Sequence, residues 1–203
     1  MNKSIFDPNT HQDQLSTKVI VGLERISEAF KVLLWEKAKV LGLSPIQIQI
    51  LIFIAYHKPE LCNVSHLAQE FNLTKPTVSD AVRVLNNKEC IVKDFSSSDN
   101  RSYTILLSHK GQKIVEETEN FAEPIKRQLD KTNDISLNTL YTSLNKLIYQ
   151  LNQIGILTVQ RTCYGCKFYD QTSKKHYCNL LDQELVDHDI RLDCPEFQEK
   201  SVE

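Results

Sequence analysis

The hydrophobic spacing of this chain changes after residue 90, and that change limits the folds open to it. Asn63 and Thr74 each precede a short run whose apolar residues lie three or four apart, the pattern of a capped amphipathic helix. Beyond them, residues 91–95 and 102–107 are rich in β-branched and aromatic side chains, which predicts two short strands. The polar segment 96–101 between them suits a hairpin loop. Two short helices are therefore followed directly by a hairpin.

Longer helices are predicted on both sides of this unit. The first has an apolar stripe on one face and ends at Gly42; the stripe comprises Leu15, Val19, Leu23, Ile26, Phe30 and Leu33. The run 46–56 is apolar enough to form a helix that is buried on most sides. After the hairpin a helix resumes at Ser108 and is kinked or restarted at Pro124. A second stripe follows at 135–157, and it comprises Leu137, Leu140, Leu144, Leu147, Leu151 and Ile154.

This order of elements is that of a winged helix-turn-helix. The predicted fold class is mostly α with a small β-hairpin wing, together with long dimerisation helices and a small metal-bound C-terminal segment. The second stripe is too long to be buried by so small a domain, which predicts a homodimer. The predicted segments are a flexible N-terminal lead-in at 1–14, a dimerisation helix at 15–42, the winged helix-turn-helix domain at 43–117, dimerisation helices at 118–158 and a cysteine-rich metal-binding segment at 159–203.

The second short helix has the features of a helix that reads DNA. Thr74 caps its N-terminus, where the free amides can meet a phosphate as the first turn enters the major groove. Helical spacing turns one set of side chains inward: Val78, Ala81, Val82 and Leu85. It turns another set outward, and together with Thr74 these are the candidate DNA contacts: Lys75, Pro76, Thr77, Ser79, Asp80 and Arg83.

The outward side chains have chemistry suited to a duplex. Lys75 and Arg83 suit phosphate or guanine, and the hydroxyl groups of the set can bond phosphate or base edges. Asp80 would repel phosphate, so it either accepts a hydrogen bond from a cytosine amino group or holds Arg83 in place. Arg101, at the tip of the wing, can enter the narrower minor groove.

Charge along the chain is uneven although the net charge is only −2. Residues 75–113 contain seven Lys or Arg against four acidic residues, whereas residues 161–203 contain six basic against nine acidic residues. The first segment can face phosphate, and the second would be repelled by it. This contrast favours DNA binding over the alternative of a winged-helix module that binds only protein.

Four stretches of the sequence resemble the MarR family of dimeric transcription regulators. They are Leu73–Ser79, Val84–Lys88, Asp99–Ser102 and Leu107–Gly111, which correspond in that family to the recognition helix, its end, the wing and the start of the following helix. The resemblance implies that Asp99 braces the wing and that Arg101 contacts DNA. It also implies that the first and last long helices intertwine across a two-fold axis. The family usually has Gly where this chain has Glu89.

Four cysteines in the C-terminal segment have the spacing C-x2-C-x11-C-x15-C: Cys163, Cys166, Cys178 and Cys194. Thiols stay reduced in the cytoplasm, so this cluster predicts one tetrahedral metal site. Zinc is favoured because a structural ion asks less of the protein, and a [4Fe–4S] cluster is the alternative because it accepts the same four thiolates. Unligated, redox-active thiols are the remaining interpretation. His176 and His188 are substitute ligands, although solvent exposure is expected for both.

The predicted function is a dimeric transcriptional regulator, expected to be a repressor, that binds a pseudo-palindromic operator in double-stranded DNA. A small-molecule effector or the state of the four-cysteine site would control it. A thiol/disulfide oxidoreductase is the alternative, but no Gly-rich nucleotide loop or nucleophile elbow supports an enzyme, and none is expected. No apolar run reaches the roughly 18 residues of a spanning helix, and the N-terminus lacks a secretory signal. The expected location is therefore the cytoplasm, without a membrane partner.

Overall fold

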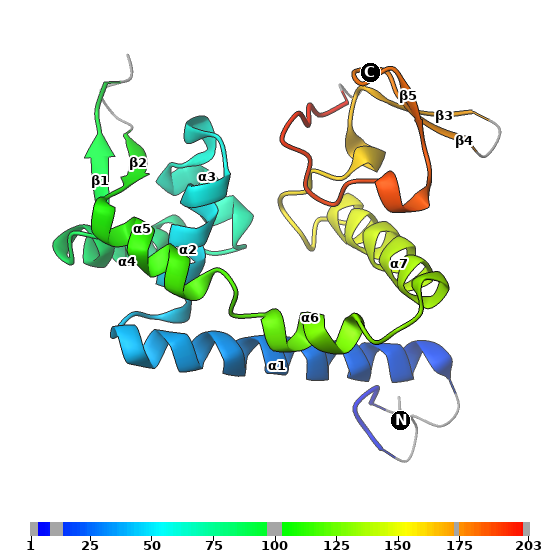
Figure 1. Cartoon of the computed structure of the whole chain (residues 1–203), viewed down its shortest axis with the longest axis horizontal. Helices are drawn as coiled ribbons and strands as arrows, with labels where there is room; N and C mark the ends of the chain where they lie inside the picture. Colours follow the sequence, from blue (N-terminus) through cyan, green and yellow to red (C-terminus); the bar gives the residue numbers. More distant parts are fainter. Residues whose placement is uncertain (1–3, 9–13, 97–102, 173–174, 201–203) are drawn as a thin grey trace.

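The computed structural model describes residues 4–8, 14–96, 103–172 and 175–200. Its longest helix, α1 (Leu15–Leu41), runs along one side of the molecule, with the winged domain over one end and the C-terminal segment over the other (Figure 1). Gly42 ends α1 in a left-handed conformation with a φ of 60°, as the sequence predicts. Within the described residues no single helix passes a length and hydropathy test for a membrane span; α1 and the next helix pass it only as a pair bent by 93°.

The winged domain has the predicted order of elements. It comprises α2 (Pro45–Tyr56), the 3-10 turn η1 (Pro59–Leu61), α3 (Val64–Glu70), α4 (Lys75–Asn87), β1 (Ile91–Asp94), β2 (Thr104–Leu107) and α5 (His109–Thr118). Its core is built around α2, whose fully buried side chains pack with those of α4 and with Ile105 of the hairpin. Burial on several sides explains why α2 is almost uniformly apolar.

Side-chain caps fix the start of each short helix. The Asn63 carboxamide accepts a hydrogen bond from the His66 N–H at 2.9 Å, and Thr74 Oγ1 accepts one from the Thr77 N–H at 3.3 Å. The strands β1 and β2 pair antiparallel, with Ile91 opposite Leu107. These elements confirm the predicted winged helix-turn-helix.

Two further helices lead away from the winged domain: α6 (Glu123–Leu129), which Pro124 restarts as predicted, and α7 (Asp134–Gln153). The predicted stripe runs to Leu157, but α7 ends earlier. Gly155 adopts a φ of 76°, and the Ile156 N–H turns back to the Leu151 carbonyl at 2.9 Å. Asn145 is the one residue of α7 that is buried within the described part of a single chain.

The C-terminal segment contains a sheet that the sequence analysis does not predict. Its strands β3 (Tyr169–Thr172), β4 (Lys175–Cys178) and β5 (Gln183–Leu185) pair antiparallel in that order, between the 3-10 turns η2 (Cys163–Gly165) and η3 (Asp187–Asp189). The segment has a small core of its own, formed by Cys163, Cys166, Tyr169, Leu185 and Ile190. The carbonyl of Ile190 anchors it to α7, because it accepts hydrogen bonds from Tyr141 Oη at 2.5 Å and Asn145 Nδ2 at 3.0 Å.

Candidate nucleic-acid interface

Helix α4 divides cleanly into a buried and an exposed face. Its buried side chains are Val78, Ala81, Val82 and Leu85, the four predicted to face inward. The seven predicted contacts that belong to this helix or its cap are all exposed: Thr74, Lys75, Pro76, Thr77, Ser79, Asp80 and Arg83. The packing of α4 therefore leaves one complete polar face free to enter a groove of DNA.

The side chain of Arg83 is already oriented on this face. Its Nη2 donates a hydrogen bond to Asp80 Oδ1 at 2.8 Å, across one turn of α4. The sequence allows Asp80 either to accept a hydrogen bond from cytosine or to hold Arg83 in place, and this contact corresponds to the second role. The ion pair is well exposed, so it contributes little stability and mainly limits where the guanidinium can point.

The wing stands next to α4, and only its base can be described. Lys93 Nζ lies 4.5 Å above the ring of Tyr103, which itself lies 5.4 Å from the ring of Phe95. The Asp94 carboxylate accepts hydrogen bonds from the N–H and the hydroxyl of Ser96, which lower the pKa of Asp94. The predicted wing residues Asp99 and Arg101 lie outside the described residues.

Two lysines of the basic segment are engaged within the protein. Lys88 Nζ donates to the Gly42 carbonyl at 2.9 Å, and Lys110 Nζ donates to the Lys88 carbonyl at 2.8 Å. They stabilise the ends of α1 and α4, so the charge count of the sequence overstates the number of lysines that face a ligand.

Glu89, where the MarR pattern has Gly, adopts the left-handed conformation with a φ of 58°. The glycine-type turn is thus retained without the glycine.

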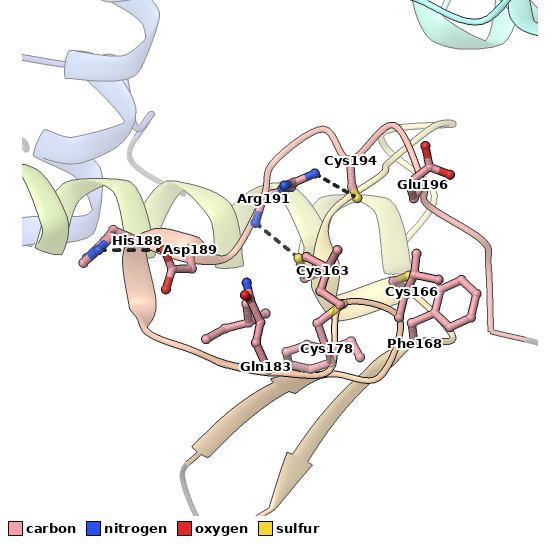
Figure 2. A pocket seen from close by; sticks show the side chains of 14 residues that line it. Cys163, Cys166, Phe168, Cys178, Gln183, His188, Asp189, Arg191, Cys194 and Glu196 are labelled. Carbon is pink, nitrogen blue, oxygen red and sulfur yellow. Dashed lines mark hydrogen bonds and ion pairs between the residues drawn. The ribbon is translucent and has the colours of Figure 1, made fainter.

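The four C-terminal cysteines come together in one place. All four line a cavity of about 280 Å³ in the C-terminal segment, and Figure 2 shows them around a common space. Cys163 and Cys166 are buried, and Cys178 and Cys194 are half-buried. Burial is the main cause of a raised pKa of the Cys163 thiol, and the charges of the other three cysteines raise it further.

The cysteines do not close around a single point. Within the described ranges, no group of three or more His, Cys, Asp or Glu side chains is arranged to hold one metal ion. The metal-bound state of this segment therefore stays a prediction. His188 is exposed as expected, whereas the side chain of His176 is 13% exposed and its Nδ1 lies 2.5 Å from the Tyr169 hydroxyl. The expectation of solvent exposure is wrong for His176, because that contact holds it in the sheet.

A cluster of ion pairs joins the C-terminal segment to α3, and sequence reasoning missed it. The guanidinium of Arg161 donates to both oxygens of Glu70, at 2.8 and 3.1 Å, and to both oxygens of Asp193, at 2.5 and 3.0 Å. His57 Nε2 lies 3.0 Å from the same Asp193 carboxylate. Burial disfavours the charge on Asp193, but the hydrogen bonds from Arg161 and His57 outweigh it and lower the pKa of Asp193.

The remaining cysteines, Cys62 and Cys90, are buried in the winged domain. Burial raises the pKa of Cys62 to about 11, so its reactive thiolate form is scarce at neutral pH. Burial also raises the pKa of Cys90. Buried thiols of this kind pack as small hydrophobic side chains.

A capped helix with an exposed polar face, followed by a hairpin and flanked by long helices, defines a winged helix-turn-helix protein. The sequence comparison agrees: residues 41–102 match the sequence model of the MarR family. This match begins at the last residue of α1, ends two residues before β2 and does not include the four-cysteine segment. The comparison with curated proteins returned no match.

Solved structures of MarR-type regulators have a similar fold. A MarR transcriptional regulator from Methanosarcina mazei Go1 is 17% identical with a TM-score of 0.58, over 67% of this chain and 97% of its own. The Staphylococcus aureus MepR–DNA complex is 22% identical with a TM-score of 0.57, over 64% and 95%. A MarR protein from Peptoclostridium difficile DA00132 is 20% identical with a TM-score of 0.60, over 70% and 92%. These similarities establish the fold.

Proposed function

We propose that this chain is a DNA-binding transcriptional regulator that acts as a homodimer on a pseudo-palindromic duplex in the cytoplasm. The observation that supports the proposal best is the exposed polar face of α4, with its capped N-terminus and its cations Lys75 and Arg83. MepR, which has a similar fold, was solved in complex with DNA. A dimer that occupies its operator would exclude other proteins from that site, so repression is the expected mode of action.

Selection from a pool of random DNA duplexes tests DNA binding without assuming an operator sequence. We expect enrichment of an inverted repeat whose half-sites lie about one helical turn, or a multiple of it, apart. Fluorescence anisotropy with the enriched duplex then gives the affinity. A pool without an enriched sequence after repeated rounds, at low salt, would leave the protein-interaction module as the better interpretation.

Removing the cations of α4 should weaken this binding. Arg83→Ala and Lys75→Ala are each expected to lower the affinity by about 1–3 kcal/mol if the side chain bonds a base, which is roughly 5- to 150-fold. Loss of a cation that bonds only phosphate would instead reduce the salt dependence: the slope of the logarithm of the binding constant against the logarithm of the salt concentration should change by about one unit. Lys175→Ala removes a cation of β4 that pairs with Glu184, and it should leave the affinity unchanged. Wild-type affinity and salt dependence in both α4 variants would contradict the proposed interface.

The homodimer is proposed from apolar surface that one chain leaves uncovered. The stripe on α1 remains exposed in the structure, and it includes Leu15, Val19, Leu23, Ile26 and Phe30. Leu140 of α7 and Ile154, which directly follows this helix, are exposed as well. Contiguous apolar surface of this kind, on helices at both ends of the fold, is typical of a protein–protein interface. A second copy of the chain would bury both helices, as the MarR resemblance implies.

Charges on the stripe should separate the two chains. We expect wild-type protein at micromolar concentration to have twice the mass of one chain by light scattering, and the double variant Val19→Glu/Ile26→Glu to have the mass of one. Val32→Glu is the control, since Val32 is as exposed as Val19 but lies about 130° from Val19 and Ile26 around the axis of α1. A wild-type protein with the mass of a single chain would contradict the dimer.

Two places could receive a regulatory signal. A cavity of about 680 Å³ lies between α1 and α2, lined in part by Phe30, Trp35 and Phe121, and could bind a small-molecule effector. The link that leads into the C-terminal segment contacts the helix-turn-helix itself, because the Thr158 N–H donates to Asn72 Oδ1 at 3.1 Å in the turn between α3 and α4. We favour the C-terminal segment as the sensor, since the link that leads into it contacts the turn directly before the recognition helix.

A further inference from the structure

We propose that the cavity lined by Cys163, Cys166, Cys178 and Cys194 binds a [4Fe–4S] cluster, with one iron held by each of the four thiolates. Neither the family match nor the similar structures assign a ligand to this segment. The proposal concerns the C-terminal segment alone, so it holds or fails independently of DNA binding.

The arrangement of the four thiols, which line one cavity without converging on one ion, favours a cluster over a single ion. A tetrahedral zinc site requires four sulfurs at about 2.3 Å from one point, which closes the space between them. Here the four cysteines share a cavity of about 280 Å³ with other side chains, among them Phe168 and Leu185, so their thiols line an open space. No three of the potential ligand side chains in the described residues converge on one ion. A four-iron cluster places its ligands at the corners of a larger body and therefore suits four thiols that face a common space without meeting.

Each cysteine is held by an element that is already hydrogen-bonded. Cys163 and Cys166 begin and follow the turn η2, where the Cys166 N–H donates to the Cys163 carbonyl at 2.9 Å. Cys178 lies in β4, opposite Tyr169 on one side and Gln183 on the other. The Cys194 N–H donates to the Arg161 carbonyl at 3.1 Å. The backbone that carries the four thiols is thus held in place by its own hydrogen bonds.

The groups beside the sulfurs also suit a cluster. The Arg191 N–H points at Cys163 Sγ, 3.2 Å away, and Arg191 Nη1 lies 3.9 Å from Cys194 Sγ (Figure 2). Hydrogen bonds to sulfur and a nearby cation stabilise the negative charge that four thiolates bring. Two carboxylates at the cavity have partners elsewhere: Asp189 accepts from the Val186 N–H at 3.0 Å, and Glu196 from Lys58 at 3.3 Å. Leu180, Leu181 and Phe168 add apolar side chains to the lining of the cavity.

The decisive measurement is the composition of the full chain purified without oxygen. We expect about four iron and four acid-labile sulfide per chain, with a broad absorption band in the visible. Protein emptied with a chelator should recover both after anaerobic incubation with sulfide and equal amounts of ferrous and ferric iron, which supply the oxidation state of a [4Fe–4S]2+ cluster. One zinc per chain without sulfide, retained when iron and sulfide are offered, would overturn the proposal. So would a chain that takes up no iron and sulfide.

Single cysteine variants locate the ligands. Cys178→Ala and Cys194→Ala remove thiols from two different elements, and each should reduce bound iron and sulfide severalfold and abolish the visible band. Cys62→Ser removes a buried thiol of the winged domain and should retain the wild-type stoichiometry and spectrum. If one pocket variant fails to fold, the other still tests the site. Wild-type iron and sulfide content in a folded Cys178→Ala or Cys194→Ala protein would also overturn the assignment.

Discussion

Replacement of Gly111 by alanine is expected to unfold the winged domain at room temperature or to bring it close to unfolding. Gly111 is buried in the first turn of α5, where a Cβ atom would lie 2.0 Å from the carbonyl oxygen of Cys90 and 3.3 Å from Leu107 Cδ2. The obstacle is backbone, so no side-chain rotation relieves it. The Cys90 carbonyl also accepts the Ser108 N–H at 3.1 Å, which ties the start of α5 to the start of β1. We expect a loss of about 4 kcal/mol or more in the free energy of unfolding.

Urea unfolding followed by circular dichroism measures this effect. Gln112→Ala, at the next and exposed position of the same helix, should change the free energy of unfolding by no more than about 0.5 kcal/mol. Gly111→Ala with the urea midpoint of the wild type would show that α5 and β1 are farther apart than in this structure. Gly111, the last residue of the MarR-like stretch Leu107–Gly111, therefore has a physical role, because only glycine permits this approach of α5 to the Cys90 carbonyl.

Local signals explain why the sequence predicts the winged domain well. Asn63, Thr74 and Ser108 are caps that act within three residues, so they can be recognised from the neighbouring residues alone. The buried face of α4 follows from helical spacing alone. Glu89 is the exception. A left-handed conformation is expected at glycine, so the sequence does not indicate one at a glutamate, and the surrounding structure must offset the energetic cost of this conformation.

The C-terminal segment shows where this reasoning ends. Strands β3 to β5 are three or four residues long and do not alternate apolar with polar side chains, so no hydrophobic period reveals them. The cysteine spacing predicts a common site, and the structure brings the four residues to one cavity. Whether four thiols converge on a point or surround a space depends on tertiary packing, which spacing does not encode. The Arg161–Glu70 contact joins residues 91 positions apart, and no pattern in the sequence indicates such a pair.

Substitution of Arg161 by methionine is expected to release the C-terminal segment from the helix-turn-helix. The side chain of Arg161 is 11% exposed and that of Glu70 is 19% exposed, so the variant leaves a carboxylate that is mostly buried without its cation. The side chain of Asp193 is 47% exposed and keeps access to water, which reduces the free-energy cost of leaving this carboxylate unpaired. We expect a loss of about 1–3 kcal/mol in docking, less than for a fully buried pair. Faster hydrogen exchange should follow in α3 and in residues 158–162, with unchanged exchange in the core of α2.

Two comparisons separate this network from general destabilisation. Lys58→Met removes an exposed ion pair with Glu196 between the same two parts of the molecule and should cost no more than about 0.5 kcal/mol. Adding Glu70→Leu to Arg161→Met removes the uncompensated charge, so the double variant should recover part of the lost protection. Unchanged exchange in α3 of Arg161→Met would contradict the docking contact. Arg161, which binds Glu70 of α3, also lies two positions before Cys163, and its carbonyl accepts a hydrogen bond from the Cys194 N–H. A structural change at the cysteine cavity can therefore reach α3, the helix that precedes the recognition helix, through this one residue.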